Sequence, residues 1–146
     1  DGILGYYGEQ LMLLAQSLGL NSCWVGGTYK VVNRAYNVDL GQKLAAVIAL
    51  GYGTTQGVPH RSKAPQAVVP GYDGAPEWFK RGVDAALLAP TALNQQKFSF
   101  SLDGEVGDVP VVRASTRRGA FAQMDLGIAQ CHFEIGAGPA LYRWAE

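Results

Sequence analysis

The chain has 146 residues, a length typical of one compact domain. Apolar residues make up 48% of it and charged residues 16%, and this balance excludes intrinsic disorder. Its 12 Lys and Arg residues balance 12 Asp and Glu residues, so the composition gives no support to nucleic-acid binding. No apolar run reaches the roughly 18 residues of a membrane span, and the first residues lack a basic segment. We therefore expect neither a membrane anchor nor a signal peptide.

Two cysteines, Cys23 and Cys131, are present, and neither lies in a C-x-x-C motif. This usage is typical of a reducing compartment, so we expect a cytoplasmic protein without a disulfide. Cys131 adjoins His132, but neighbouring residues of a helix point about 100° apart and do not readily share a metal ion. We therefore interpret Cys131 as a core residue and His132 as a hydrogen-bonded boundary residue, and we predict no metal site.

The first part of the chain contains two predicted helices and two predicted strands. Residues Gly8 to Leu18 carry apolar side chains at helical spacing, so we predict a helix that starts at the glycine. Asn21 to Val25 is predicted as a strand, followed by a brief helix from Thr28 to Val32. Lys43 to Leu50 is almost continuously apolar, which favours a central strand buried on both faces. Thr54 to Pro70 is the predicted linker, and it carries a compact basic cluster.

The second part combines two predicted helices with a hairpin. A helix begins around Pro76 and is expected to bury Phe79, Val83, Ala86 and Leu87. Alternation from Lys97 to Leu102, a turn at Asp103-Gly104 and a returning strand from Val109 to Ala114 predict the hairpin, with Pro110 suited to an edge position. The last helix begins near Ala120. Five apolar residues are expected on its buried face: Phe121, Met124, Ile128, Cys131 and Ile135.

No nucleophile and base can be placed together from the sequence, so ordinary hydrolysis has no support. Three segments remain as candidates for binding a ligand through polar groups. The segment His60-Arg61-Ser62-Lys63 offers cations for a ligand phosphate, or is a solvated basic loop. Residues Pro90 to Gln96 offer amides and a hydroxyl to a planar ligand, or form a polar connection. Gly8 would let backbone N–H groups approach a ligand, although a simple helix start explains it equally well.

Four segments resemble motifs of the nitroreductase family. Gly8-Glu9-Gln10, with the following Ser22-Cys23-Trp24, resembles a glycine-started helix and its "GLGTCW" strand. Ile48 to Gly53, with the basic segment after it, resembles the "ALGYP" strand and phosphate loop. Leu88 to Gln96 is similar to the "APSALNxQPW" flavin signature, and Met124 to His132 resembles the "DLGIAxxH" helix. Together these segments span nearly the whole chain.

The order of the segments resembles the single-chain branch called "putative TM nitroreductase", in which two related halves are fused. This resemblance implies an α/β (α+β) nitroreductase-like fold, the FMN-dependent nitroreductase fold, with a central sheet flanked by helices. It implies that residues 1–146 are a fragment, the C-terminal portion of a longer chain, with half-units at about 1–64 and 71–146. An upstream "RRSxR" phosphate motif would then be missing. Two departures are Lys97-Phe98, near the place of the usual Pro-Trp, and Thr91, which replaces Ser but keeps a hydroxyl.

The resemblance also implies a function, that of a NAD(P)H-dependent nitroreductase. Such an oxidoreductase passes hydride from NAD(P)H through FMN to a nitroaromatic, a quinone or a similar small-molecule acceptor. The flavin performs the chemistry, so no catalytic side chain is expected. The resemblance assigns six cofactor-binding residues: Arg61 and Lys63 for the FMN phosphate, Thr91 and Asn94 for the flavin region, and Gly8 and Glu9 for the isoalloxazine at the helix N-terminus. Gln95 and Gln96 are secondary candidates.

Two alternatives stay open: a non-catalytic flavin-binding module, and a flavoenzyme of different acceptor chemistry, such as reductive dehalogenation or flavin breakdown. The implied partners are the missing N-terminal portion of the same chain and the electron acceptor. A homodimer also stays open, because ordinary family members place FMN at a dimer interface. The sequence does not distinguish NADH from NADPH, and it allows the fragment alone to be inactive.

Overall fold

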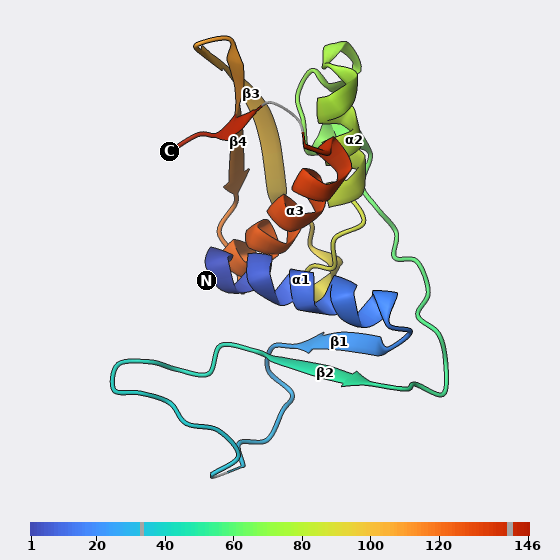
Figure 1. The fold of residues 1–146 in the computed structure, drawn as a ribbon, viewed down its shortest axis with the longest axis vertical. Helices are drawn as coiled ribbons and strands as arrows, with labels where there is room; N and C mark the ends of the chain where they lie inside the picture. Colours follow the sequence, from blue (N-terminus) through green and yellow to red (C-terminus); the bar gives the residue numbers. More distant parts are fainter. Residues whose placement is uncertain (33, 140–141) are drawn as a thin grey trace. The chain divides into compact units, whose positions relative to one another are not determined.

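The computed structural model describes residues 1–32, 34–139 and 142–146. These residues form three α-helices and two small sheets, which confirms the predicted mixed α+β class (Figure 1). Contacts divide the chain into two units, one of Gln10–Val58 and one of Asp1–Glu9 with Pro59–Glu146. The half-units expected at about 1–64 and 71–146 stay a prediction. Within the described ranges, no helix combines the length and apolar character needed to cross a bilayer.

The unit of residues 10–58 contains a two-stranded antiparallel sheet. Its strands are β1 (Asn21–Val25), as predicted, and β2 (Val47–Gly51), with Cys23 opposite Ala49. β2 is shorter than expected, and its last three residues are exposed. The prediction of a central strand buried on both faces is therefore wrong. The cause is that an apolar run indicates a strand without determining how many strands pair with it.

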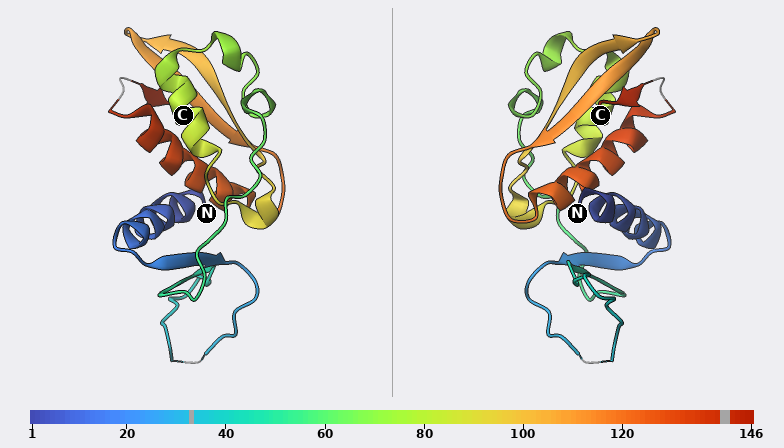
Figure 2. Two further views of the ribbon diagram at one scale, coloured as in Figure 1. Left: turned by 90° about the vertical axis from the view of Figure 1, so that its right-hand side faces the viewer. Right: turned by 90° about the vertical axis from the view of Figure 1, so that its left-hand side faces the viewer.

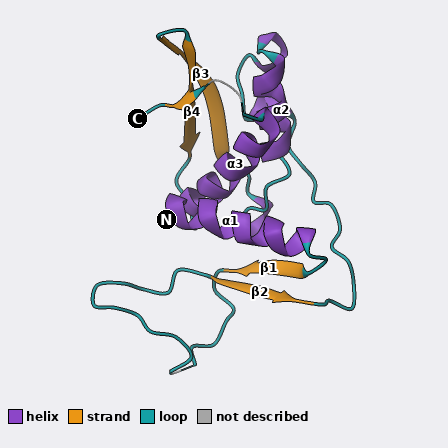
Figure 3. Cartoon of the chain, in the orientation of Figure 1, coloured by secondary structure: helices purple, strands orange, loops and turns teal. Residues whose placement is uncertain are grey.

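The connection from β1 to β2 is loop in its described residues (Figure 3). The brief helix predicted from Thr28 to Val32 is therefore wrong, and β-branched side chains, which favour extended backbone, end that segment. Hydrogen bonds from side chains help to hold the loops of this unit. Tyr29 Oη donates to the Leu44 carbonyl at 3.3 Å, and the Gly53 N–H donates to Asn21 Oδ1 at 2.8 Å.

Helix α1 (Gly2–Ser17) begins before the predicted start at Gly8. Glycine in a helix interior costs roughly 1 kcal/mol relative to alanine, which is why the sequence favoured the later start. Tertiary packing overrides this cost at Gly5, which is buried against α3 (Ala122–Ala137). A Cβ on Gly5 would overlap the backbone of Met124, so glycine permits this close helix crossing.

Helix α2 (Glu77–Ala86) is confirmed, and Phe79, Val83, Ala86 and Leu87 are all buried as predicted. It packs on α3, where a Cβ on Gly136 would overlap the backbone of Arg81. Met124, Ile128 and Cys131 of α3 are buried, but Phe121 and Ile135 are 40% and 62% exposed, so their predicted burial is wrong. Phe121 precedes the helix in a left-handed conformation, and Ile135 lines an open pocket near the helix end.

The second sheet has the order β3-β4-β5, from β3 (Phe98–Val106), β4 (Val109–Thr116) and β5 (Arg143–Trp144). The turn predicted at Asp103-Gly104 is wrong. The register shifts between Leu102 and Glu105, with Gly104 at φ 89°, and the chain turns at Gly107-Asp108. The glycine therefore permits an irregularity within the strand rather than a turn.

Pro110 lies in β4, which is the middle strand rather than an edge. The edge position expected for this proline is therefore wrong. β5 pairs with β4 only at Val111 and Val112, just after the proline. The missing N–H of Pro110 therefore interrupts no pairing with β5.

The core of the unit of Asp1–Glu9 and Pro59–Glu146 lies between the second sheet and helices α2 and α3 (Figure 2). Phe133 of α3 is fully buried at its centre, with ring contacts to Phe79 of α2 and Phe100 of β3. Tyr142 and Trp144 contact the same ring from the C-terminal segment. The sheet and both helices therefore pack on one aromatic cluster.

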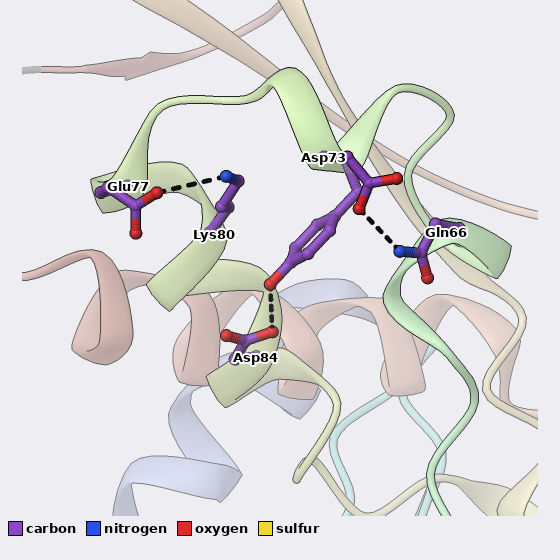
Figure 4. Close-up of polar contacts among 6 residues, drawn as sticks. Gln66, Asp73, Glu77, Lys80 and Asp84 are labelled. Carbon is purple, nitrogen blue, oxygen red and sulfur yellow. Dashed lines mark hydrogen bonds and ion pairs between the residues drawn. The ribbon is translucent and has the colours of Figure 1, made fainter.

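Polar contacts fix the 3₁₀ turns η1 (Pro65–Ala67) and η2 (Tyr72–Gly74) before α2 (Figure 4). Tyr72 Oη donates to Asp84 Oδ1 at 2.7 Å, and this bond raises the pKa of Tyr72 to about 12. Gln66 Nε2 donates to Asp73 Oδ1 at 2.9 Å, and Lys80 pairs with Glu77 at 3.2 Å. The cation at this end of α2 thus has a carboxylate partner.

Candidate functional site

The basic segment His60 to Lys63 is anchored to the fold at both ends. His60 Nε2 and Ser62 Oγ lie 3.0 and 2.8 Å from the Leu87 carbonyl, which accepts hydrogen bonds from both at the end of α2. Lys63 Nζ donates to the carbonyls of Gln95 and Gln96, at 2.9 and 2.6 Å. Arg61 is exposed between these anchors. The segment is therefore held in place and presents one guanidinium outward.

Gln96 joins this segment to the loop of residues 90–96, and it is only 2% exposed. Its Oε1 accepts the N–H of Lys63 at 2.8 Å. Its Nε2 donates to the Arg61 carbonyl at 3.0 Å and to Asn94 Oδ1 at 2.6 Å. A single buried amide thus fixes both predicted phosphate-binding residues relative to Asn94.

The loop itself adopts a strained backbone. Leu93, Asn94 and Gln96 have φ values of 51°, 51° and 42°, in the left-handed region that costs a non-glycine residue roughly 1–3 kcal/mol. Side chains hold this shape, because Asn94 Nδ2 donates to the Arg61 carbonyl at 3.0 Å and Thr91 Oγ1 accepts the Gln96 N–H at 3.1 Å. Such strain recurs at ligand-binding sites.

Asp125 of α3 also holds the loop of residues 90–96 through hydrogen bonds. Its carboxylate accepts the Ala92 N–H at 3.0 Å and Gln95 Nε2 at 2.6 Å. Burial raises the pKa of Asp125, although these hydrogen bonds and the nearby Lys97 oppose the shift. The start of α3 and the loop of residues 90–96 are therefore joined by hydrogen bonds.

Cations gather around Lys63. Partial burial lowers the pKa of Lys63, and the positive charges of Arg117 and Lys97 lower it further. The ammonium of Lys63 has three N–H donors, of which two are used by the carbonyls of Gln95 and Gln96. One N–H donor of Lys63 is left near the positive charges of Arg117 and Lys97. An anion binds to such a donor through a charge-assisted hydrogen bond.

Gly8 and Glu9 lie in the interior of α1. The prediction that Gly8 starts a helix and presents free N–H groups is wrong, because α1 begins at Gly2. The Glu9 carboxylate is buried and lies 2.8 Å from His132 Nε2, as expected for a hydrogen-bonded boundary histidine. Cys131 is a buried free thiol, as predicted, and burial raises its pKa to about 11. Glu9 therefore contacts α3 through His132, and the cofactor-binding role expected of Gly8 and Glu9 stays a prediction.

The structure thus brings Arg61, Lys63, Thr91 and Asn94 into one hydrogen-bonded cluster. Sequence reasoning gave too little weight to Gln96, which connects the cluster, and missed Asp125, which supports it. The signal for Asp125 was its place in the first turn of an apolar helix, and the signal for Gln96 was its place within the amide-rich loop.

Comparison with known proteins supports a family assignment. The model of the family described as "Putative TM nitroreductase" matches residues 1–137. The chain belongs to this family. It is also similar in structure to a protein of Thermotoga maritima MSB8 described as a "putative nitroreductase", with a TM-score of 0.64 and 24% sequence identity. The match covers 88% of this chain and 51% of the other, so the chain spans about half of that protein's length. No curated protein matches the sequence.

Family membership confirms the resemblance read from the sequence, and the structural match confirms the nitroreductase-like fold. The two segments that meet through Gln96 are those that resembled the phosphate loop and the flavin signature. That junction is therefore the candidate site of this nitroreductase-family chain.

Leu93 provides a first test of the strained loop. Its side chain is fully exposed, so Leu93→Gly removes no packing and relieves the left-handed strain. We expect the free energy of unfolding to rise by about 0.5–1 kcal/mol in urea titrations. Leu88→Gly is the matched control, because Leu88 is also exposed but has no left-handed backbone. That control should destabilise the protein by about 0.5–1 kcal/mol, and equal effects of the two changes would contradict the strain.

Proposed function

We propose that this chain contributes to an FMN site and acts in an oxidoreductase that passes hydride from NAD(P)H to a nitroaromatic, a quinone or a similar acceptor. The observation that carries the proposal is the junction through Gln96, which fixes Arg61 and Lys63 beside Thr91 and Asn94. Family membership supports the same class of chemistry.

The donors that remain at this junction fit a flavin mononucleotide. Arg61 is exposed, and Lys63 keeps one N–H donor, so both suit a phosphate dianion. Asn94 Nδ2 uses one of its two hydrogens for the Arg61 carbonyl, and the Thr91 hydroxyl still has its proton. These groups suit the heteroatoms of an isoalloxazine. The exposed Leu93 between them adds an apolar surface for a ring.

The residues of this chain would bind and orient the cofactor. When bound, FMN would supply hydride acceptance and donation, so the protein needs no acid or base of its own for that exchange. Arg61 and Lys63 would neutralise the phosphate, and the Gln96 hydrogen bonds would keep both at a constant distance from Asn94. The strained loop would hold its donors in place before the ligand arrives, which lowers the entropic cost of binding.

The complete activity is also a proposal, because the chain spans about half the length of its solved relative. We propose that a further portion of the same protein, or a second copy, completes the flavin site. We also propose a cytoplasmic location, which the two free cysteines support. The acceptor would be a small molecule that approaches the flavin.

Arg61→Ala tests the phosphate assignment. We expect the FMN affinity to fall about tenfold, because a charge-assisted hydrogen bond to phosphate is lost, while riboflavin, which lacks the phosphate, binds unchanged. Quenching of flavin fluorescence measures both affinities. Arg81→Ala removes another exposed arginine, on α2, and should change neither. Equal FMN affinity of Arg61→Ala and the unchanged protein would overturn the assignment.

The reaction itself is tested on the purified protein. A yellow protein that oxidises NADPH with a nitroaromatic or a quinone supports the full proposal. A yellow protein without this oxidation favours the flavin-binding module or another acceptor chemistry. A colourless protein that takes up no FMN would reject a flavin function for this chain.

A further inference from the structure

Helices α1 and α3 cross at two glycines that hold equivalent positions. A Cβ on Gly5 of α1 would overlap the carbonyl oxygen of Met124. A Cβ on Gly127 of α3 would overlap the carbonyl oxygen of Gly2. Met124 and Gly2 each lie three positions before the crossing glycine of their own helix. The crossing is therefore symmetric, and residues at the same distance along the chain from Gly5 and from Gly127 are equivalent.

On α3, the positions that follow the crossing glycine are covered by the rest of the unit. Ala129 and Phe133 are fully buried. The ring of Phe133 lies 5.4 Å from that of Phe79 in α2 and 4.8 Å from that of Phe100 in β3, measured between centroids. A Cβ on Gly136 would overlap the backbone of α2. A helix and a hairpin therefore cover this face of α3.

The equivalent positions of α1 carry large apolar side chains that are exposed. Counted from Gly5, they are Tyr7, Leu11 and Leu14, and their exposed fractions are 60%, 58% and 55%. Ile3 lies on the same helix face by its spacing and is also exposed. These four residues form the α1 stripe. The exposed face of a helix normally carries polar side chains, so a continuous apolar stripe indicates an interaction surface.

The strands that follow the two helices differ in the same way. β5, after α3, carries Trp144 and pairs in parallel with β4 of the hairpin. β1, after α1, carries Trp24 and pairs with β2, and in the described parts of the chain no third strand joins that sheet. A two-stranded sheet is only marginally stable by itself. The segment of α1 and β1 therefore lacks a layer that the segment of α3 and β5 has.

We propose that the α1 stripe is an interaction surface for a helix and a β-hairpin similar to α2 and β3–β4, supplied by a further portion of the same protein. One strand of that hairpin would pair in parallel with β1, as β4 pairs with β5. The contact face of this partner is apolar, because the stripe offers it no charge. The structural match leaves about half of the solved relative uncovered, which is enough chain for such a layer.

A second copy of this chain fits the stripe less well. Its own α2 and β3 are already packed on Phe133 of its own α3, so they would have to leave that core first. The proposal therefore commits to a further portion of the same polypeptide. It does not rest on the proposed flavin chemistry.

The test measures how fast a thiol reagent reaches the α1 stripe in the complete product of the gene. Leu11→Cys places a thiol within the stripe, and Tyr7→Cys repeats the test at a second position. Val106→Cys is the matched control, because Val106 is 54% exposed on the hairpin, away from the stripe. All variants also carry Cys23→Ser, since Cys23 is exposed and Cys131 is buried. Circular dichroism verifies folding, and analytical ultracentrifugation gives the mass.

We expect the thiols of Leu11→Cys and Tyr7→Cys to react about tenfold more slowly than that of Val106→Cys, in a monomer. Amide hydrogens of β1 should exchange as slowly as those of β4, because a strand would lie on each side of β1. Labelling of all three thiols at equal rates would show that the stripe is open to solvent, and would reject the proposal.

Two further results would overturn the proposal in different ways. Protection that appears only in a dimer would assign the stripe to a second copy. Protected thiols combined with rapid exchange of β1 would exclude the hairpin as the partner. None of these measurements involves a flavin, so a colourless protein with a protected stripe would keep this interface while the flavin proposal fails.

Discussion

Gly127→Ala is expected to lower the free energy of unfolding by about 3 kcal/mol, as in severe overpacking of a core. Gly127 lies in α3, and a Cβ there would overlap the carbonyl of Gly2 and crowd the N–H of Tyr6. Backbone atoms cannot rotate away as side chains do, so α1 and α3 must separate locally. Urea unfolding followed by circular dichroism measures the loss.

The sign of the change in the free energy of unfolding distinguishes steric crowding at Gly127 from helix propensity. Helix propensity alone predicts that alanine stabilises a helix by up to roughly 1 kcal/mol relative to glycine. Gly74→Ala is the control, because nothing lies within 4 Å of its Cβ position and its φ is not positive. We expect that control to change stability by less than about 0.5 kcal/mol. A stabilising Gly127→Ala would mean that the helices do not cross as described.

Gln96→Glu is expected to cost about 3 kcal/mol at pH 7 and to abolish tight FMN binding. The new carboxylate keeps an acceptor for the Lys63 N–H, but it replaces the donor that serves the Arg61 carbonyl and Asn94 Oδ1. Two acceptors then face a buried charge, and each unsatisfied buried group costs about 1–3 kcal/mol. Urea unfolding and flavin titration measure the two losses.

The pH dependence of Gln96→Glu has a defined sign. Burial and the facing acceptors raise the pKa of the introduced carboxyl in the folded state above its unfolded value. Its protonated form is therefore favoured on folding, so the destabilisation shrinks as the pH falls and grows as the pH rises. Gln10→Glu is the same change at an exposed glutamine of α1, and it should have less than about 0.5 kcal/mol of effect. Equal losses at positions 10 and 96 would remove Gln96 from its connecting role.

Local patterns predicted elements wherever one face of the element is packed. The spacing of Phe79 and Val83 identified α2 correctly, since both are fully buried on one side of that helix. The same reasoning failed for the start of α1, because Gly5 is needed for contact with α3 and local propensity cannot include such a contact. It also failed at Gly104, where the glycine permits a register shift instead of a turn.

The sequence predicted most residues of the candidate site, but not the hydrogen bonds that join them. Arg61, Lys63, Thr91 and Asn94 were identified from residue type and resemblance, and the structure places them in one cluster. The helix start expected at Gly8 was wrong, and the cofactor-binding role of Gly8 stays a prediction. The connecting role of Gln96 depends on bonds to residues far along the chain, including Arg61, so its neighbours in sequence carry no signal of it.

The docking of α1 on α3 has a consequence for the order of folding. Tyr6 donates to Glu134 across 128 positions of sequence, and Glu9 meets His132 across 123 positions. The β3–β4 hairpin, by contrast, joins strands that are adjacent in the chain. Because the entropic cost of closing a loop grows with its length, local pairing should form first and the α1 contact late. The step that seats Glu9 beside His132 would then belong to the final stage of folding.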